Sequence, residues 1–525
     1  MERRTFIGTT AATLAAATVA GCTSGGSGGA SAQNSGNTGA STSGTPIRTS
    51  SAAATSPATL KALARDLDGL LVQPGEAKWA AARQLYNTRF DDLKPTAVAY
   101  IAHPDDIRTA LKYARAHRTP VAIRNGGHSY AGWSSGTGRL VIDVSKLSGI
   151  RASGGSATIG GGAKLIDVYR SLAAKGVTLP AGSCPTVGIS GLTLGGGHGV
   201  VSRAYGLTCD SLTSATLITA DGKQLTASAS ENKDLFWALR GAGNGNFGVV
   251  TELTYRTHAA PQGVSAYMTW PWSKAAAVVK AWQAWGPGQP DEIWSSLHLA
   301  NTPGGTPTVS VACFSLGTYG ELQNAVDRLA DKIGAPARSV SLKRRTYEES
   351  MEVYAGCSSF PTDAQCHLPG TTPGRTPQGA LNRETYAASS DFYDRSLSAA
   401  GIRTLLSQIE NVTGAGAGSI ALTALGGAIN RVDPTATAFV HRRSRMLAQY
   451  LASWRAGTSG KPAQAWLKKA HGAMGRYASG AAYQNYTDAT LTNWREAYYG
   501  DAAPRLKKLK KQYDPGRFFD FPQAL

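Results

Sequence analysis

Residues 182–199 read GSCPTVGISGLTLGGGHG, and this glycine-rich stretch decides how the rest of the chain is interpreted. Glycines packed this densely cost conformational entropy on folding, so such a stretch is typical of a backbone that approaches a ligand closely. It is not a Walker-type phosphate loop, because it lacks the Gly-Lys-Ser/Thr ending whose lysine reaches a terminal phosphate. The stretch therefore predicts a ligand-contacting loop of another kind.

A second glycine-rich segment, RNGGHSY, covers residues 124–130 and follows the strand-like residues 120–123. Paired Gly126 and Gly127 allow a tight turn that presents N–H groups to an anion such as a pyrophosphate, and Arg124 would add positive charge. For this string alone, a β-hairpin turn carrying a surface His128 is the alternative interpretation.

The third glycine-rich segment, GAGNGNFG at residues 241–248, contains a formal G-x-G-x-x-G match. A Rossmann fingerprint needs a strand before the glycines and a helix after them. Here the preceding residues 234–240 are helix-like and residues 249–258 are strand-like, so the order is reversed. A dinucleotide is therefore not expected at a Rossmann turn.

Around these segments the hydrophobic pattern predicts an α+β chain. Helical spacing occurs at residues 60–71 and 105–117, and strand-like runs occur at 96–102, 120–127, 139–145, 156–162, 211–222 and 247–258. After residue 261 the strands lengthen and alternate with alanine-rich helices at 274–285 and 319–333. These changes predict a second domain over 261–477 and a closing segment over 478–525.

The N-terminus predicts export. Adjacent Arg3 and Arg4 precede an apolar run that ends at Cys22, a pattern typical of a twin-arginine signal over residues 1–22. Val19 to Cys22 also resembles a lipobox, and an ordinary signal peptide with an incidental Cys22 is the alternative. Residues 23–57 are rich in Gly, Ser, Thr and Ala and predict a disordered linker. An extracellular or cell-surface lipoprotein is expected, with a lipid at Cys22 as its membrane contact.

The chain is basic, with 53 Lys and Arg against 34 Asp and Glu among 525 residues. Basic surfaces attract nucleic acid, but these charges are scattered outside Lys507–Lys511, so solvated surface charge is favoured and no nucleic-acid partner is expected.

Four of the six cysteines can be interpreted from their spacing and context, given that the protein is expected to be exported. Cys357 and Cys366 favour a disulfide, because no CxxC pair supports a metal site. Cys209 and Cys313 lie in apolar or strand-like contexts and are expected to be buried thiols.

The glycine-rich segments, together with YQNYTD at residues 483–488 and YDP at 513–515, resemble the vanillyl-alcohol oxidase superfamily and, within it, the berberine bridge enzyme-like flavoproteins. The resemblance covers residues 95–525. It implies a two-domain flavoprotein of vanillyl-alcohol oxidase type. The FAD domain at 58–260 would have two α/β subdomains, and the substrate domain at 261–477 an antiparallel sheet covered by helices. The segment at 478–525 would return to the FAD domain.

The resemblance also implies covalently bound FAD, linked from His128 to the flavin 8α carbon and from Cys184 to C6. An accessible thiolate and a free imidazole nitrogen suit this chemistry; a buried structural thiol and a surface turn histidine are the alternatives. The further residues expected at the cofactor are Arg124, Asn125, Gly126, Gly127, Ser129, Tyr130, Pro185, Thr186, Val187, Gly188, Ser190, Gly191, Gly195, Gly196, Gly197, His198, Gly199, Asp210, Gly248, Val249, Val250 and Asn485.

For catalysis the resemblance implies that a tyrosine removes the substrate proton while hydride leaves for the flavin. Tyr486 is the candidate base, ionised or activated by a neighbouring cation, and Tyr483 is the second candidate. Core aromatics are the alternative for both. Val187 lies where the family tunes access of dioxygen, and its small size favours an oxidase. Residues 439–442 are expected on a substrate-domain strand that faces the flavin.

The leading hypothesis is an exported FAD-dependent oxidase that takes hydride from an alcohol group of a sugar or small natural product and passes the electrons to O2. One alternative is oxidative cyclisation or dehydrogenation in secondary metabolism. Another is a surface lipoprotein that binds a sugar or polyanion without turnover.

Overall fold

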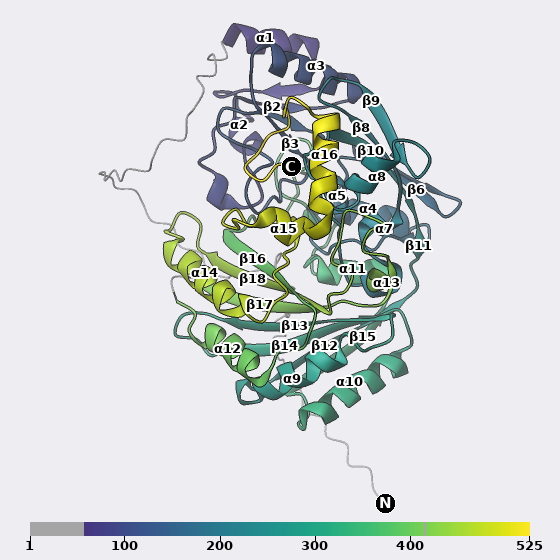
Figure 1. Cartoon of the computed structure of the whole chain (residues 1–525), viewed down its shortest axis with the longest axis vertical. Coiled ribbons are helices and arrows are strands. Elements are labelled where there is room, and N and C mark those ends of the chain that lie inside the picture. The colour runs from purple at the N-terminus through teal and green to yellow at the C-terminus, as the bar shows by residue number, and fades with distance from the viewer. Residues whose placement is uncertain (1–56, 414–415) are drawn as a thin grey trace, which may run out of the picture.

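The computed structural model describes residues 57–413 and 416–525 (Figure 1). The predicted signal at 1–22 and all but the last residue of the predicted linker at 23–57 lie outside these ranges. Pro57 begins the first helix. Within the described ranges, no helix is long and apolar enough to cross a membrane.

The first part of the chain forms a four-stranded sheet in the order β1-β2-β4-β3. β2, β4 and β3 run parallel, and β1 is antiparallel to β2. Helix α3 connects β2 to β3 and buries Ile107 and Leu111, as its helical spacing predicts. The elements are α1 (Pro57–Asp66), β1 (Leu70–Val72), α2 (Trp79–Ala82), a 3-10 turn (Thr88–Phe90), β2 (Ala97–Tyr100), α3 (Pro104–Ala116), β3 (Val121–Arg124) and β4 (Leu140–Asp143).

The helix predicted over residues 60–71 is too long, because α1 ends at Asp66 and Leu70 and Leu71 belong to β1. The backbone N–H of Asp68 donates to Asp106 Oδ1 at 2.9 Å, a bond that a continuing helix would not make. Gly69 then passes so close to the Tyr100 carbonyl that a Cβ would overlap it. The chain therefore turns from helix to strand at residues 68–69.

A second sheet has five antiparallel strands in the order β5-β6-β10-β8-β9. Helix α8 precedes the third glycine-rich segment and β10 follows it, as predicted from the reversed order. The elements are β5 (Ile150–Ser153), β6 (Ser156–Gly160), α4 (Leu165–Ala173), β7 (Val177–Thr178), α5 (Ile189–Leu194), α6 (Ser202–Tyr205), α7 (Thr208–Ser211), β8 (Leu212–Ile218), β9 (Gln224–Ser228), α8 (Lys233–Leu239), β10 (Val249–Arg256) and β11 (His258–Ala259).

The third sheet has seven antiparallel strands in the order β15-β12-β14-β13-β17-β18-β16. Helices α9, α10, α12 and α14 cover one face, and the other face is turned toward the first two sheets (Figure 1). The elements are β12 (Gly263–Trp270), a 3-10 turn (Trp272–Lys274), α9 (Ala275–Trp285), β13 (Ile293–Asn301), β14 (Thr308–Ser315), α10 (Tyr319–Ile333), β15 (Ser339–Arg345), α11 (Tyr347–Tyr354), a 3-10 turn (Asp363–Cys366), β16 (Tyr386–Tyr393), α12 (Ala399–Glu410), β17 (Gly416–Ala424), α13 (Ala428–Arg431), β18 (Met446–Trp454) and α14 (Lys461–Gly475).

The C-terminal segment packs against the second sheet rather than extending away from the molecule (Figure 1). Leu506, Leu509 and Leu525 are buried in the same core as the strands of that sheet. The elements are a 3-10 turn (Gln484–Tyr486), α15 (Trp494–Tyr499), a 3-10 turn (Gly500–Ala502) and α16 (Ala503–Tyr513). The α+β class and its sheet-and-helix layers are confirmed.

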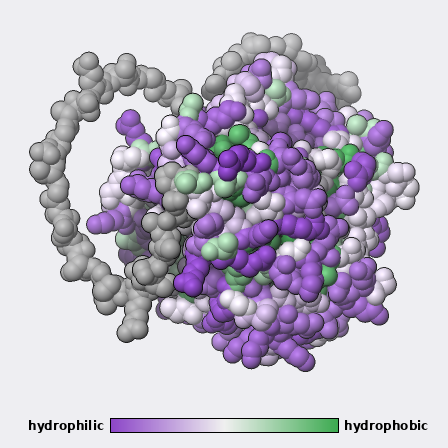
Figure 2. All heavy atoms as spheres, turned by 90° about the horizontal axis from the view of Figure 1, so that it is seen from above, coloured by the Kyte–Doolittle hydropathy of each residue, from purple (hydrophilic) through white to green (hydrophobic). Residues whose placement is uncertain are grey.

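The surface agrees with scattered, solvated charge. The face in Figure 2 is mostly hydrophilic, with small hydrophobic groups interspersed. Lys510, in the most basic run of the sequence, is buried and donates to Asp514 at 2.7 Å and to the Asn246 carbonyl at 2.7 Å. The run is therefore not one continuous basic face.

Candidate functional site

All three sheets and the C-terminal segment contribute to one cavity of about 350 Å³. Most residues expected at the cofactor line it, together with both candidate tyrosines. These are Asn125, Gly126, Gly127, His128, Ser129, Tyr130, Cys184, Val187, Gly188, Ser190, Gly191, His198, Gly199, Gly248, Val250, Tyr483, Asn485 and Tyr486. The lining does not include Arg124, Pro185, Thr186, Gly195, Gly196, Gly197, Asp210 or Val249.

The imidazole of His128 is half-buried and held in one orientation. Its Nε2 lies 2.8 Å from the Thr186 hydroxyl, and its ring stacks on Tyr86 with centroids 4.0 Å apart. Burial, and secondarily the charge of Lys164, lowers the pKa of His128 to about 3. His128 is therefore a neutral imidazole whose Nδ1 is not used in the Thr186 bond. It is not the surface histidine of a hairpin turn.

Arg124 does not supply charge to the cavity. Its guanidinium is buried and donates from Nε to Asp143 Oδ2 at 2.5 Å. Beside it, Lys164 donates to Asn125 Oδ1 at 2.7 Å, and Asn125 Nδ2 donates to the Ser190 hydroxyl at 3.2 Å. The polar groups around residue 124 thus fix residues 124–130 from the side that faces away from the cavity. The expectation that Arg124 faces an anion does not fit this placement.

Residues 182–199 are not a continuous loop, because α5 lies within them. Cys184 is half-buried, and Cys184 and Val187 line the cavity while Thr186 lies behind His128. A Cβ on Gly126 would overlap the Thr186 carbonyl oxygen, so glycine at 126 lets the two segments pack together. We call residues 124–130 and 182–199 the glycine wall of the cavity.

Gly195, Gly196 and Gly197 lie behind the cavity lining and help to pack the surrounding segments together. Gly197 has a φ of +81°, and its backbone N–H donates to the Tyr483 hydroxyl at 2.8 Å. Asn485 Nδ2 donates to the same hydroxyl at 2.9 Å, and Asn485 Oδ1 accepts from Asn244 at 2.9 Å. Tyr483 therefore fixes the glycine wall to the C-terminal segment, which leaves Tyr486 as the better placed of the two candidate bases.

Two other expected cofactor contacts have structural partners instead. Asp210 accepts from Arg442 Nη1 and Nη2 at 2.8 and 2.7 Å and from the Leu207 backbone N–H at 2.9 Å. Val249 alternates with the cavity-lining Gly248 and Val250 along the chain, so its side chain is buried in the core of the first sheet.

The strand expected at residues 439–442 is absent, and these residues form an irregular segment before β18. Phe439 packs edge-on against Tyr483 with ring centroids 6.1 Å apart, and His441 Nε2 donates to the Tyr498 carbonyl, 3.0 Å away. Since a carbonyl oxygen only accepts, Nε2 carries the proton. Residues 439–442 support the site rather than line it.

The opposite side of the cavity was not predicted residue by residue. His298 of β13 pairs with Ala421 of β17, which pairs with Gln449 of β18, and all three line the cavity. Directly paired residues of antiparallel strands share a face. The next paired row on that face is Ser296, Thr423 and Leu447. We call these six residues the sheet wall; strand alternation indicates such a face, but not which face meets a cavity.

The sheet wall reaches the candidate base through Tyr130. Gln449 Nε2 donates to the Tyr130 hydroxyl at 2.7 Å, and the Tyr130 ring stacks on Tyr486 with centroids 5.4 Å apart and an interplanar angle of 5°. Burial lowers the pKa of His298 to about 4, so its imidazole is neutral. The wall therefore offers neutral polar groups next to Tyr486.

Several polar atoms of the lining are buried but unpaired within the described residues, as expected where a polar ligand binds. They are Ser134 Oγ, Asn244 Oδ1, Trp294 Nε1, His298 Nε2, Gln484 Oε1 and Gln523 Oε1. Four of these residues, Ser134, Asn244, Gln484 and Gln523, lie on segments outside the third sheet, whereas Trp294 and His298 lie on β13. Their spread over several segments of the lining fits a long ligand such as FAD together with a second molecule at the third sheet.

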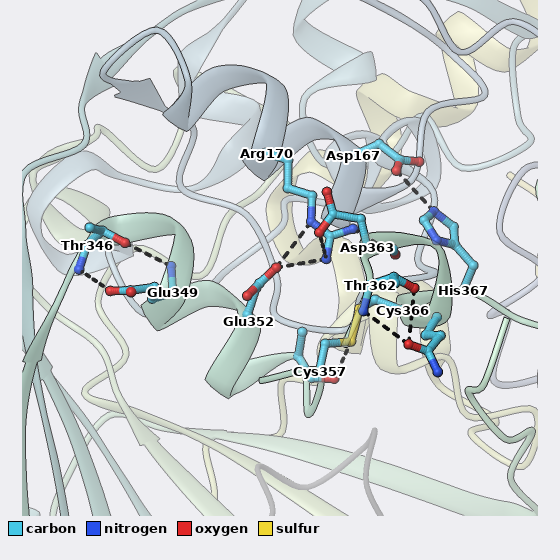
Figure 3. A network of polar contacts seen from close by, with 12 residues as sticks. Asp167, Arg170, Thr346, Glu349, Glu352, Cys357, Thr362, Asp363, Cys366 and His367 are labelled. Atoms are coloured by element: carbon cyan, nitrogen blue, oxygen red, sulfur yellow. Dashed lines mark hydrogen bonds and ion pairs between the residues drawn. A yellow bond between two sulfur atoms is a disulfide. The ribbon is translucent and has the colours of Figure 1, made fainter. Parts of the chain in front are cut away.

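The predicted disulfide is confirmed, since Cys357 and Cys366 are bonded. Figure 3 shows this bond within a network that joins α4 to α11 and to the segment after α11. Arg170 donates to Glu352 at 2.8 Å, and His367 Nε2 lies 3.0 Å from Asp167 Oδ1. Cys209 and Cys313 are buried free thiols, also as predicted.

Comparison with known proteins agrees with this architecture. An FAD binding domain model matches residues 95–228, and a berberine and berberine-like model matches residues 482–525. The uncharacterized FAD-linked oxidoreductase YgaK of Bacillus subtilis is 32% identical over 465 residues, which cover 87% of this chain and 97% of YgaK. Chitooligosaccharide oxidase of Gibberella zeae is 29% identical, covering 86% of this chain and 91% of its own.

Solved structures give the same result. Physcomitrella patens BBE-like 1 superposes with a TM-score of 0.80 at 30% identity, covering 89% of this chain and 98% of its own. Xylooligosaccharide oxidase from Myceliophthora thermophila, in complex with xylobiose, has a TM-score of 0.77 at 27% identity, with coverages of 89% and 98%. The motif-based resemblance is thus confirmed, and the chain belongs to the berberine bridge enzyme-like family of FAD-linked oxidoreductases.

Proposed function

We propose that this protein is an exported oxidase that removes hydride from an alcohol group of a sugar or small natural product and passes the electrons to O2. The observation that carries the proposal is that one cavity is lined by His128 and Cys184 and also by Tyr486 and the sheet wall. A cofactor and a hydroxyl-bearing substrate would meet there. Bound FAD would accept the hydride, while the protein positions the substrate and takes its proton.

A sugar is the favoured substrate because the sheet wall presents neutral hydrogen-bonding groups rather than charges. Its polar members are His298, Ser296, Thr423 and Gln449. Two similar proteins are named as oxidases of chitooligosaccharides and xylooligosaccharides, which supports a carbohydrate. A binding lipoprotein without turnover is not favoured, since the relatives are named as oxidoreductases and oxidases. The half-buried Val187 side chain in the lining supports access of O2.

The proposal includes two covalent links to the flavin, from His128 and from Cys184. His128 suits this role because its imidazole is neutral and oriented by Thr186. Cys184 suits it because its half-buried side chain lines the same cavity as His128. The proposed export and the lipid at Cys22 rest on the N-terminal sequence alone.

The links are tested by acid precipitation of the holoprotein. Wild type should retain yellow flavin in the pellet, and His128→Ala and Cys184→Ala should each retain it through the remaining link. The double variant should release all of it. Flavin released from wild type, or retained by the double variant, would contradict the assignment.

The activity is tested by measuring hydrogen peroxide release across a panel of mono- and oligosaccharides and simple alcohols. The proposal expects peroxide with at least one sugar, in proportion to sugar oxidised. Flavin reduction by a sugar without peroxide would instead identify a dehydrogenase with another electron acceptor. No reduction by any sugar, with product formation from another natural-product class, would favour oxidative cyclisation or dehydrogenation.

A further inference from the structure

The hydroxyl of Tyr486, the proposed base, has one side-chain partner within the described part of the chain. This partner is His198, whose Nε2 lies 2.9 Å from the Tyr486 oxygen. The two rings are nearly perpendicular, with centroids 5.8 Å apart and an interplanar angle of 79°. Both side chains line the cavity. The pair thus joins the glycine wall to the C-terminal segment at the point where a substrate hydroxyl would have to lie.

The cation expected to activate Tyr486 is not there. Across the described ranges, no lysine or arginine forms a hydrogen bond or a cation–ring contact with Tyr486. Burial raises the pKa of Tyr486 well above its usual value, so at neutral pH it is a phenol. A phenol oxygen can take the substrate proton only if its own proton moves to another group.

His198 is suited to receive that proton. Burial lowers the pKa of His198 to about 4, so the imidazole is neutral at physiological pH and one ring nitrogen carries a lone pair. The titratable groups that face it are Tyr483 and Tyr486, and burial raises the pKa of both. Neither is charged at neutral pH, so neither would compete for the proton.

We propose that His198 is the proton acceptor behind Tyr486, so that the two residues act as a relay. The inference rests on the proposed alcohol oxidation. The substrate carbon gives its hydrogen, with the bonding electron pair, to bound FAD as hydride. The substrate hydroxyl proton passes to the Tyr486 oxygen as the Tyr486 proton passes to His198 Nε2. The substrate becomes a carbonyl compound, the flavin is reduced by two electrons, and His198 is left protonated. His198 acts through Tyr486 and is a positioning residue.

The relay predicts a distinctive pH profile for flavin reduction, measured by stopped flow between pH 3.5 and 10 with a sugar that reduces wild type. In wild type the rate should be constant through neutral pH and fall as pH drops toward about 4, where His198 becomes protonated. Tyr486 acting alone as a phenolate would give a rate that rises tenfold per pH unit across the neutral range. That rise in wild type would overturn the relay.

His198→Gln separates proton transfer from structure, because glutamine can accept the Tyr486 hydrogen bond but cannot take its proton. We expect the rate of flavin reduction at pH 7 to fall by about 100-fold, which is the lower end of the range for loss of general base catalysis. The remaining rate should rise with pH. His258→Gln is the matched control. His258 is also a histidine whose pKa is lowered to about 4, but it contacts Ser211 and lies outside the cavity lining. A His198→Gln variant with the wild-type rate and profile would overturn the proposal.

A measurement without substrate separates this proposal from the proposed function. The relay requires an unprotonated Nε2 on His198 in the resting holoprotein. Nitrogen NMR of protein labelled at histidine, with the His198 signal assigned by its absence in His198→Gln, should show the proton on Nδ1 at pH 7. A protonated Nε2 would overturn the relay even if every sugar is oxidised as proposed. If no sugar reduces wild type while Nε2 is unprotonated, the proposed substrate class fails and the relay stands.

Discussion

The two walls of the cavity are built in opposite ways. The glycine wall consists of two continuous segments whose backbones pack tightly, with Gly126 against Thr186, and whose buried polar groups hold one another from behind. The sheet wall takes two residues from each of three strands, β13, β17 and β18, and its polar side chains extend from a regular backbone. One wall therefore depends on precise loop conformation, whereas the other can change its side chains without disturbing its backbone.

This difference predicts unequal responses to mutation. Changes in the glycine wall should lower stability and cofactor binding together, because the same backbone segments pack against one another and line the cavity. Changes in the sheet wall should affect substrate binding alone. A protein that binds FAD normally but has a new substrate preference should therefore carry its differences in the sheet wall.

The largest effect is expected from Arg124→Met, which leaves buried Asp143 without its ion-pair partner behind the glycine wall. Removing one member of a buried pair lowers the free energy of unfolding by about 3–5 kcal/mol. Chemical denaturation of holoprotein measures this change, and the flavin content should fall with it. Arg151→Met removes the exposed partner of Glu252 and serves as the control, with an expected change below about 1 kcal/mol. Equal effects of the two variants would mean that the glycine wall does not depend on the buried pair.

An intermediate effect is expected from removing the Cys357–Cys366 disulfide, which packs on Ile166 of α4. The backbone N–H of Ile166 donates to the Pro185 carbonyl at 3.1 Å, so this contact connects the disulfide to the glycine wall. A disulfide that closes a loop this short contributes about 2–3 kcal/mol. The double variant Cys357→Ala/Cys366→Ala should unfold at lower denaturant and retain flavin less well. Unchanged flavin retention in the destabilised variant would show that the disulfide does not support the glycine wall.

The same contrast explains what the sequence could predict. His128, Cys184 and Tyr486 each lie in a short continuous motif, and the resemblance of these three motifs to the flavoprotein family implied that they meet at one site. The partner of Arg124 was not predictable, because the string RNGGHSY equally allows Arg124 to face an anion or to pair with Asp143 on the adjacent strand. In the sequence, His298 lies more than a hundred residues before both Ala421 and Gln449. Only the register of the paired strands brings the three side chains together. The alternation along β13 identifies two faces, but the choice between them depends on tertiary packing.

The smallest expected effect is at the centre of the sheet wall. Ala421 lies between His298 and Gln449, which are two strand spacings, or about 10 Å, apart across the sheet. The small side chain leaves room for a ligand group between two hydrogen-bonding residues. Ala421→Leu should fill that room and raise KM for the best sugar about tenfold, which corresponds to about 1.4 kcal/mol of binding.

Three measurements decide whether this wall acts on substrate alone. In Ala421→Leu the flavin content, the acid-stable flavin and the denaturation midpoint should all match wild type, because the backbone of β17 stays paired on both sides. Ala421→Ser is the control, since the small serine side chain keeps most of the room and should keep KM within about twofold, which is less than about 0.5 kcal/mol of binding. If Ala421→Leu lost flavin together with affinity, the two walls would be coupled, and substrate preference could not change independently of cofactor binding.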